Sequence, residues 1–536
     1  AIEKAINEVQ TKYGQIGSFL YLHPHYVCQN GNFKQHFTTE KDKLKMVFLL
    51  AKHLKQALNK LGEQQRANFM TVTRLDGQLG LGKRGNVSIV GGGLTGLVKS
   101  LNLEWSPVFC RAIDVQPEWA HEGAAKQVLK EWHDADTSVV EVACTSTSRQ
   151  TIIAVEVETP ENQMITTSVT PNDVFVVSGG AKGVTATCVV EMAKAFKCKF
   201  VLLGRSVNDF VVPNYALNEE NEGALKRLIM QDLKQKGEKA TLLTVKKIYK
   251  NIVAQKEITN TIQKINQYGG EAVYVKTDVT KAYEVKAKVQ EAAKNLGEIT
   301  GLIHGAGRLA DKFIENKTAQ DFDDVISVKV DGLLSMLACA DINKLKHLIL
   351  FSSVAGFYGN VGQTDYAMAN EILSKATHLF KTNHPNAQAT AINWGAWDGG
   401  MVSPALKKRF EEAGVSLVNS EGGAAMFVNE FNVKYANQAQ VIIGGTLPAA
   451  KSYINDKLNN YTIKRELKAK NNAFLYDHVI QGNPVLPVVN AIGWMANVCE
   501  RLFPDFKVGK IENTSLFKGI VFDGNEIENY TAQVKE

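Results

Sequence analysis

The stretch LFSSVAGFYGNVGQTDYAMANEIL, residues 350–373, decides how we interpret the fold. It begins as an apolar run, passes through a glycine-rich loop and continues with helical spacing, which predicts a strand, a loop and a helix. Ser353 closes the predicted strand. Tyr366 and Asn370 stand four residues apart on the predicted helix, so both side chains face one side. Each of these residues alone could be structural, and their meaning depends on the rest of the chain.

Strand and helix patterns alternate on both sides of this stretch, from about residue 172 to 445. Buried apolar strands separated by helices predict a parallel sheet that is covered by helices on both faces. The long polar segment 206–262 is expected to hold a loop and an extra helix, or to be a solvated insertion without function. The predicted strands are DVFVVSG, KFVLLGRS, AVYVKTDV, TGLIHGAG, HLILFSS and ATAINWG.

The composition is typical of a globular protein and excludes several function classes. The 536 residues are 45% hydrophobic and 22% charged, which is enough for several domains. A net charge of +6 without arginine-rich runs does not favour nucleic acid, and no apolar run is long enough to span a membrane. The seven scattered cysteines form no metal-type cluster, so we expect reduced thiols in a cytoplasmic protein and no metal. We also expect the chain to be a piece of a longer polypeptide.

The first part of the chain resembles a reduced copy of the second. YGQIGSFLYL at 13–22 aligns with LGEITGLIHG at 296–305, and GLVKSLNLEW at 96–105 resembles ILSKATHLFK at 372–381. The second alignment, carried backward, puts Val90 and Leu94 at the positions of Tyr366 and Asn370. The first copy has therefore lost the reactive groups, and it begins too late to hold a nucleotide-binding first strand. We predict that it is a structural half.

A glycine-rich turn, VVSGGAKGVTAT, follows the first strand of the second part. Glycines let a backbone approach a pyrophosphate, and the following helix points its free N–H groups and its positive dipole end at the phosphates. The turn resembles the TGxxxGxG turn of short-chain dehydrogenases, with Ser178 for the threonine and Thr185 for the last glycine. The residues predicted to contact the phosphates are Ser178, Gly179, Gly180, Ala181, Gly183 and Val184.

The end of the second strand favours NADPH over NADH. An acidic residue there would bond the ribose 2′-hydroxyl, but this chain has Arg205 and Ser206. Arginine offers a planar, always charged fork for a phosphate, although a surface arginine at a strand end is the alternative. Further cofactor contacts are predicted for the adenine edge and the nicotinamide side, at Asp278, Val279, Gly305, Ala306 and Gly307.

The side chains of the opening stretch fit the needs of a carbonyl reductase. A proton donor must reach the carbonyl oxygen, and a nearby ammonium would lower the tyrosine pKa from about 10. Lys329, in SVKVDGLLS on the preceding predicted helix, could supply that charge and bind ribose. Tyr366 would then be the general acid, Ser353 would polarise the carbonyl, and Asn370 would hold a relay water.

These motifs together resemble the ketoreductases of type I polyketide and fatty acid synthases. The stretch from Leu350 matches the family pattern FSSxAGxxGxxGQxxYxxAN, and GLVKSLNLEWSPVFCRAIDV resembles the family's truncated structural half. With VFVVSGGAKGVTATCV and NWGAWDGGMV, the likeness extends to the multienzyme subunit of bacterial polyunsaturated fatty acid synthases, over residues 1 to about 450. The resemblance implies an α/β fold of two Rossmann-like halves, of which only the second, a doubly wound parallel sheet, is catalytic.

The resemblance also implies a substrate. It would be a 3-oxoacyl thioester on the phosphopantetheine arm of an acidic acyl carrier protein, and NADPH would reduce it to the 3-hydroxyacyl thioester. Asp311 in GRLADKF matches the last residue of the family's Leu-Asp-Asp signature and favours the 3R product, whereas Tyr358 stands where a tryptophan marks the opposite class. Trp397 and Met401 would belong to a lid over the substrate or to the core.

The segment LYDHVIQGNPVLP near the C-terminus carries the pattern HxxxGxxxxP with His478, Gly482 and Pro487. It resembles the start of a hot-dog dehydratase, in which a histidine removes a proton and a distant acid protonates the leaving hydroxyl. We expect that acid to lie beyond the chain, so this piece alone should not dehydrate; an inactive docking fold is the alternative. The predicted regions are a structural half at 1–165, a catalytic half at 166–450, a linker at 451–470 and a partial dehydratase at 471–536.

Three functions remain open at this point. The first is an active NADPH-dependent ketoreductase that works with a carrier protein and the other domains of a synthase. The second is a non-catalytic scaffold of the same synthase, which the intact Lys–Ser–Tyr–Asn set argues against and Thr185 supports. The third is a dehydrogenase acting on a free alcohol or a sugar nucleotide, which the degenerate first half disfavours.

Overall fold

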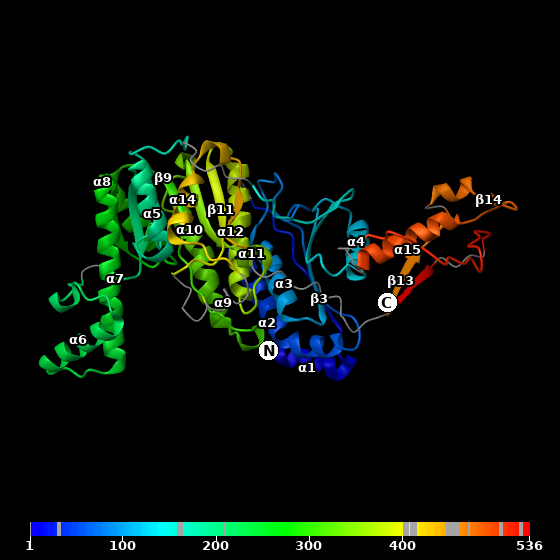
Figure 1. Cartoon of the computed structure of the whole chain (residues 1–536), viewed down its shortest axis with the longest axis horizontal. Helices are drawn as coiled ribbons and strands as arrows, with labels where there is room; N and C mark the ends of the chain where they lie inside the picture. The colour runs from blue at the N-terminus through cyan, green and yellow to red at the C-terminus, as the bar shows by residue number, and fades with distance from the viewer. Residues whose placement is uncertain are drawn as a thin grey trace. The chain divides into compact units, whose positions relative to one another are not determined.

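A computed structural model of the chain defines two compact units. The first is formed by Ala1–Ala124 and Val140–Ala449, and the second by Ala125–Val139 and Ala450–Glu536 (Figure 1). The residues that the structure describes are 2–28, 34–134, 136–157, 165–207, 210–399, 407, 415–445, 460–469, 472–502, 507–524 and 529–535.

The first half of the first unit is built on a five-stranded sheet with the order β1-β2-β3-β4-β5. Its first four strands run parallel and the last is antiparallel. β2 and β3 are buried along their whole length, as expected for parallel strands covered on both faces. The strands are β1 (Ser18–Leu22), β2 (Ala67–Thr73), β3 (Val108–Val115), β4 (Glu141–Cys144) and β5 (Arg149–Gln150), and the helices are α1 (Ile2–Tyr13), α2 (Phe37–Gly62), η2 (Val90–Gly92) and α3 (Gly93–Glu104). α4 (His121–Trp132) begins in this unit and belongs to the second unit from Ala125 onward.

The second half is a doubly wound sheet of seven parallel strands, as predicted, with the order β12-β11-β10-β9-β6-β7-β8. The chain reverses its direction of winding between β6 and β9, and ligands of such sheets bind at the carboxyl ends of the strands at this point. The strands are β6 (Val174–Ser178), β7 (Lys199–Gly204), β8 (Glu271–Lys276), β9 (Ile299–His304), β10 (His347–Ser353), β11 (Gln388–Trp394) and β12 (Gln440–Ile443).

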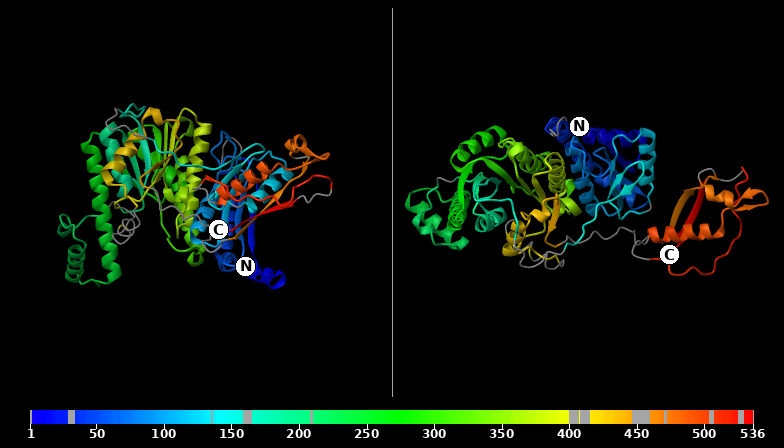
Figure 2. Two further views of the ribbon diagram at one scale, coloured as in Figure 1. Left: turned by 45° about the vertical axis from the view of Figure 1, so that its right-hand side comes forward. Right: turned by 90° about the horizontal axis from the view of Figure 1, so that it is seen from above.

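Helices cover both faces of this sheet in the α/β arrangement (Figures 1 and 2). The segment before β10 is continuous from α9 through a π-helical turn into α10. The bounds are α5 (Gly183–Phe196), α6 (Glu222–Gln235), α7 (Leu242–Gln267), α8 (Ala282–Leu296), η4 (Ile314–Asn316), α9 (Ala319–Ile326), η5 (Ser327–Asp331), α10 (Gly332–Leu337), η6 (Ile342–Lys344), α11 (Val354–Tyr358), α12 (Thr364–Asn383) and α14 (Ser420–Asn429).

The two halves meet along α3 and α12, which lie side by side (Figures 1 and 2). The backbones approach so closely that a Cβ atom on Gly96 would lie 2.4 Å from the carbonyl oxygen of Ala367. Beside this contact, the buried Lys99 ammonium lies 2.7 Å from Glu371 and 3.0 Å from Glu141. The first half is therefore fixed directly to the helix that carries Tyr366.

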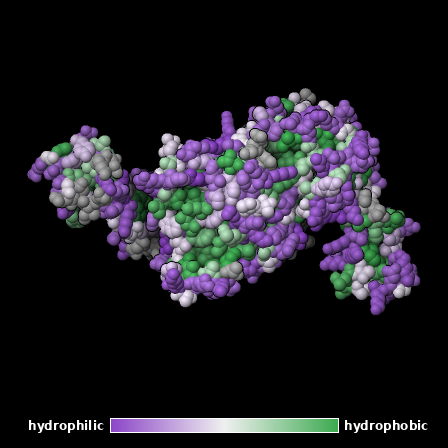
Figure 3. Space-filling view, turned by 180° about the vertical axis from the view of Figure 1, so that it is seen from behind, coloured by the Kyte–Doolittle hydropathy of each residue, from purple (hydrophilic) through white to green (hydrophobic). Residues whose placement is uncertain are grey.

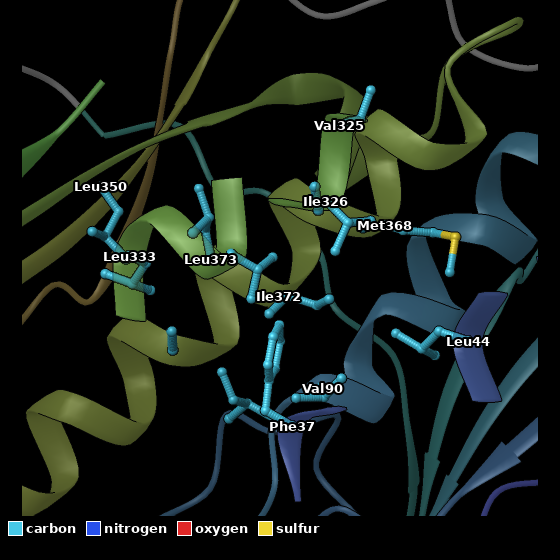
Figure 4. Close-up of a cluster of buried hydrophobic side chains, with 14 of the residues drawn as sticks. Phe37, Leu44, Val90, Val325, Ile326, Leu333, Leu350, Met368, Ile372 and Leu373 are labelled. Atoms are coloured by element: carbon cyan, nitrogen blue, oxygen red, sulfur yellow. The ribbon is translucent and has the colours of Figure 1, made fainter. Parts of the chain in front are cut away.

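One hydrophobic core runs through both halves. Phe37, Leu44 and Val90 of the first half belong to the same buried cluster as Met368 and Ile372 of α12 (Figure 4). Burial of apolar area stabilises folds by about 25 cal/mol per Å², so a shared core of this kind favours unfolding of the two halves together. Val90, the first residue of η2, thus lies in the same core as α12, the helix that carries Tyr366.

The polar segment 206–262 folds into more than the single extra helix that we expected. It forms α6 and the first part of α7, which project from the second half (Figures 1 and 2). Apolar residues at helical spacing explain this, because they let the two helices bury one another. The small core of this arm contains Ala216, Leu225, Ile229, Leu233, Val245 and Ile252.

The surface seen in Figure 3 is mainly hydrophilic, with hydrophobic patches between the hydrophilic residues. Among the described residues, no helix combines the length and the apolar character that crossing a membrane requires.

The second unit contains β13 (Asn460–Glu466), paired antiparallel with β16 (Asn529–Lys535), a short hairpin of β14 and β15, and α15 (Val488–Leu502). β13 lies inside the range 451–470 that we predicted to be a linker. Half-buried Tyr461 and Ile463 alternate with exposed residues in this strand, a period of two that is too short here for our sequence analysis to have recognised it. Two paired strands beside one helix do not define a hot-dog fold, which stays a prediction. The hairpin strands are β14 (Val479–Ile480) and β15 (Asn483–Pro484).

Candidate active site

The glycine-rich turn lies between β6 and α5, at the carboxyl edge of the sheet. Gly179 and Gly183 have φ angles of +72° and +60°, a conformation that side chains with a Cβ rarely adopt. A Cβ on Gly183 would meet nothing within 4 Å, so the space in front of the first turn of α5 is open. The free N–H groups of that turn can therefore receive an anion from the sheet edge.

Thr185, the residue that departs from the dehydrogenase turn, is accommodated by a second glycine. Its side chain is 5% exposed, and a Cβ on Gly305 would lie only 2.3 Å from its Oγ1. The volume added by Thr185 is thus offset by the missing side chain of Gly305 at the end of β9. Thr185 therefore packs between the helix and the sheet without a clash.

Two cations flank the end of β7. Arg205 is exposed just after the strand, and Lys182, in the phosphate turn, donates a 3.0 Å hydrogen bond from Nζ to Ser206 Oγ. Burial alone would raise the pKa of Asp278, but hydrogen bonds from Thr280 and the charge of Arg205 hold it below its ordinary value. Our sequence analysis missed Lys182, although its place between Gly180 and Gly183 was the available signal.

The four predicted catalytic residues come together at the carboxyl end of β10. Ser353 is the last residue of that strand, and its Oγ accepts the Ala355 N–H at 3.2 Å. Tyr366 and Asn370 lie on α12, where Asn370 Nδ2 donates to the Tyr366 carbonyl at 2.8 Å. Lys329 Nζ lies 5.4 Å from the centroid of the Tyr366 ring.

The protonation of this group differs from our hypothesis. We expected Lys329 to lower the Tyr366 pKa, but burial raises it, the hydrogen bonds of Asn370 and Ser353 oppose that rise, and the charge of Asp311 adds to it. Burial also lowers the pKa of Lys329 to about 7, because a desolvated ammonium is unfavourable. Its Nζ donates to the carbonyl oxygen of Phe351 at 2.6 Å. Tyr366 thus holds its proton, while Lys329 titrates near neutral pH.

His304, a residue that our sequence analysis did not select, connects the glycine-rich turn to Lys329. Its Nδ1 lies 2.7 Å from Ser178 Oγ and its Nε2 lies 2.8 Å from the Lys329 carbonyl oxygen. Because a carbonyl only accepts, Nε2 carries the proton and Nδ1 accepts from the Ser178 hydroxyl. Ser178 Oγ in turn accepts the Ala306 N–H at 3.1 Å. Burial, and then the charge of Lys329, lower the His304 pKa to about 3, so the ring is neutral.

The carbonyl that His304 binds belongs to the π-helical turn η5. A π turn inserts one residue into a helix and often marks a functional site. In this turn, Lys329 Nζ donates to the carbonyl oxygen of Phe351, and the carbonyl oxygen of Lys329 accepts from His304. The polar histidine at the end of an apolar strand, directly before the glycines of HGAG, was the signal in the sequence.

The predicted substrate residues have different surroundings. Asp311 Oδ2 accepts a 3.0 Å hydrogen bond from Gln363 Nε2 at the start of α12. Tyr358 packs edge-on against Phe357, with ring centroids 4.8 Å apart, and burial raises its pKa. Trp397 is 6% exposed and packs in the core with Trp394. Met401 lies outside the described residues.

The dehydratase-like residues belong to the second unit and are described there alone. His478 is exposed, and its Nδ1 lies 2.9 Å from the Val485 carbonyl oxygen across the β14–β15 hairpin. Gly482 turns the hairpin with a φ of +85°, and Pro487 precedes α15. Across the described part of the chain, no group of histidine, cysteine and acidic side chains could hold a metal ion.

The comparison with protein families agrees with this geometry: residues 174–399 match the family described as KR domain. This chain contains a KR domain. The matched range begins at the first residue of β6 and includes the phosphate turn, η5, Ser353 and α12. The predicted resemblance to ketoreductases is thereby confirmed, whereas the dehydratase part has no such support.

Known relatives of the chain are synthases. A polyunsaturated fatty acid synthase subunit from Thraustochytrium sp. is 36% identical over 98% of the chain, and the chain spans 18% of that relative. Polyketide synthase PksN from Bacillus subtilis is 33% identical over 34% of the chain, and the matched part spans 3% of PksN. The chain therefore spans less than a fifth of the length of either relative.

Solved structures share the fold. The chain superimposes on an N-terminal ketoreductase from the macrolactin assembly line with a TM-score of 0.61 and 19% identity, covering 83% of this chain and 76% of that one. For a ketoreductase domain from the bacillaene assembly line, the TM-score is 0.57 and the sequence identity is 19%. The match covers 81% of this chain and 94% of that one. The α/β fold with two Rossmann-like halves is confirmed.

Proposed function

We propose that the KR domain reduces a 3-oxoacyl thioester to the 3-hydroxyacyl thioester with NADPH, inside a polyunsaturated fatty acid or polyketide synthase. The observation that carries this proposal is the meeting of Lys329, Ser353, Tyr366 and Asn370 beside the glycine turn. The names of the relatives support the synthase setting. An acidic acyl carrier protein that carries the substrate is part of the proposal. The other synthase domains would be its partners in the cytoplasm.

The residues at the sheet edge fit NADPH. The glycine turn, with its open space before α5, would hold the pyrophosphate. Arg205 and Lys182 supply positive charge at the end of β7, where a 2′-phosphate would lie, and the described residues that follow the strand, 205–207, include no acidic side chain. Asp278, Val279 and Gly305 to Gly307 would contact the adenine and nicotinamide sides. When bound, NADPH supplies the hydride.

Residues of the chain would supply the proton that the carbonyl oxygen receives. The Ser353 hydroxyl would donate to the carbonyl oxygen as negative charge develops on it. The Tyr366 O–H would transfer its proton to that oxygen, and its raised pKa keeps it protonated until then. Lys329 would bind the ribose hydroxyls and stabilise the resulting phenolate with its ammonium form, while Asn370 would hold a water for reprotonation. Asp311 and Tyr358 would contact the substrate and set the hydroxyl configuration.

A substrate comparison with the purified chain tests this proposal. NADPH absorbance at pH 7 would be followed with an acetoacetyl thioester, and the reverse reaction would be assayed with free secondary alcohols. Oxidation of NADPH by the thioester, without reaction of the alcohols, is expected. Reaction of the alcohols alone would indicate a dehydrogenase of free alcohols. Absence of both reactions together with absence of NADPH binding would indicate a scaffold.

A further inference from the structure

A buried ion pair lies directly beside Tyr366. Lys317 follows η4 and Asp365 lies in the first turn of α12; their side chains are 0% and 1% exposed, and Lys317 Nζ lies 2.7 Å from Asp365 Oδ1. Charges this deeply buried are costly unless each compensates the other. The remaining hydrogen bonds of the pair show which segments it connects.

On one side, the pair fixes the start of the helix that carries Tyr366. Asp365 Oδ1 accepts the Tyr366 backbone N–H at 2.8 Å in addition to the Lys317 ammonium. Asp365 Oδ2 is buried and has no hydrogen-bond partner among the described residues. Burial raises the pKa of Asp365, and the charge of Lys317 opposes that rise. The carboxylate therefore depends on Lys317 for its stability.

On the other side, the pair holds the loop that carries Asp311. Lys317 Nζ donates to the Ala310 carbonyl at 2.9 Å, directly before Asp311. The Asp311 carboxylate is in turn bonded to Gln363, which precedes α12. One ammonium thus connects the substrate loop and the first turn of the tyrosine helix.

The structural half reaches the same point. Lys52 Nζ, on α2, donates to the Lys317 carbonyl at 2.5 Å. The Lys312 N–H donates to the Gly362 carbonyl at 3.0 Å, which adds a backbone link between the loop and the approach to α12. Lys317 therefore stands where the structural half, the substrate loop and the tyrosine helix converge.

We propose that Lys317 is a positioning residue of the reductase site, which fixes the Tyr366 phenol and the Asp311 carboxylate relative to one another and so determines which face of the 3-oxo group is reduced. This inference rests on the proposed function, because it takes Tyr366 as the proton donor and Asp311 as a substrate contact. Displacement of a reacting group by about 1 Å can cost about 10²-fold in rate. Reduction of the two faces passes through separate barriers, so such a displacement also changes the ratio of hydroxyl configurations.

The test compares Lys317→Met with the double variant Lys317→Met/Asp365→Asn. The double variant leaves no unpaired charge, and its amide oxygen can still accept the Tyr366 N–H. Lys346→Met is the matched control, because it removes an ammonium 2.9 Å from buried Asp173, beside the start of β10 rather than its end. For each protein, kcat, NADPH affinity, the unfolding midpoint and the ratio of 3-hydroxy enantiomers are measured.

We expect Lys317→Met to lower kcat by about 10- to 100-fold with unchanged NADPH affinity, and to shift the enantiomer ratio. The double variant should recover part of kcat, and Lys346→Met should keep the parental kcat and ratio. A folded Lys317→Met protein with parental kcat and parental enantiomer ratio would overturn the inference. If Lys317→Met does not fold, the double variant is tested instead. A folded double variant with parental kcat and parental enantiomer ratio would then overturn the inference.

Hydrogen exchange separates failure of this inference from failure of the proposed function. An inactive parent would overturn the proposed function, and the amides of Tyr366 and Lys312, both hydrogen-bonded in the connection described above, then report on positioning without turnover. Faster exchange at both amides in Lys317→Met supports the inference. Unchanged exchange at both amides overturns it.

Discussion

The Nε2 atom of His304 lies 2.8 Å from the carbonyl oxygen of Lys329, and this bond joins the end of β9 to the π turn that carries the amine. The other ring nitrogen accepts from Ser178 in the phosphate turn, 2.7 Å away. The glycine-rich turn and Lys329 are therefore held by one neutral imidazole. One ring nitrogen accepts from Ser178 and the other donates to the Lys329 carbonyl, so a substitution can remove one of these hydrogen bonds and keep the other.

Two substitutions of His304 should separate the effects of its two hydrogen bonds on kcat. His304→Leu removes both hydrogen bonds and leaves the Lys329 carbonyl buried without a donor, at a cost of about 1–3 kcal/mol. We expect kcat to fall by about 10- to 100-fold and NADPH binding to weaken. His304→Gln keeps a donor for the carbonyl and should retain more of kcat. Steady-state kinetics and fluorescence titration check this, and equal kcat losses in the two variants would count against the assigned bond.

Arg205 should determine the preference for NADPH over NADH. Its guanidinium would form a charge-assisted bond to the 2′-phosphate, worth about 1.5–3 kcal/mol. Arg205→Leu should therefore raise KM for NADPH by about 10- to 100-fold and leave KM for NADH unchanged. Arg227→Leu, at another exposed arginine on α6, is the control. Parallel changes in both KM values would show that Arg205 does not contact the 2′-phosphate.

The contact between Thr185 and Gly305 predicts a rescue. Gly305→Ala should weaken NADPH binding by at least about tenfold, because its Cβ would stand 2.3 Å from Thr185 Oγ1 and overpacking costs about 1–3 kcal/mol. Thr185→Gly/Gly305→Ala removes the clash and should restore binding. Fluorescence titration of the parent, both single variants and the double variant checks this prediction. Additive losses in the double variant would refute it.

Lys329 should make the stability of the fold depend on pH. Burial lowers its pKa to about 7 from an ordinary value of 10.5, so between these pH values the unfolded chain binds a proton that the folded chain does not. Stability therefore rises with pH across this window, by at most about 5 kcal/mol from this group. Denaturant unfolding at pH 7 and pH 10 should show a smaller rise for Lys329→Met than for the parent. An identical rise would place the lysine pKa near its ordinary value.

Local sequence patterns were enough to predict the strands, the helix and the glycine-rich turn on which the candidate site residues lie. An apolar run that ends in Ser353, and the spacing of Tyr366 and Asn370 by one helical turn, follow from rules that span only a few residues. The glycine turn after β6 and the parallel sheet are predictable for the same reason. Such patterns determine which edge of the sheet carries the side chains.

Other features depend on contacts between residues far apart in the sequence. His304 meets Ser178 and Lys317 meets Asp365 only once the strands are assembled, so no local period indicates these pairs. The raised Tyr366 pKa follows from burial, which spacing does not report. The α6–α7 arm was underestimated because its apolar residues are spread through a lysine-rich segment.

The comparison of the parent with Tyr366→Phe tests the central claim most directly. Phenylalanine keeps the ring that packs near Lys329 and removes only the hydroxyl that would transfer the proton. With an acetoacetyl thioester and NADPH, we expect turnover in the parent, a loss of at least about 10²-fold in kcat in the variant, and equal NADPH binding in both. Turnover of Tyr366→Phe at the parental rate would contradict the account.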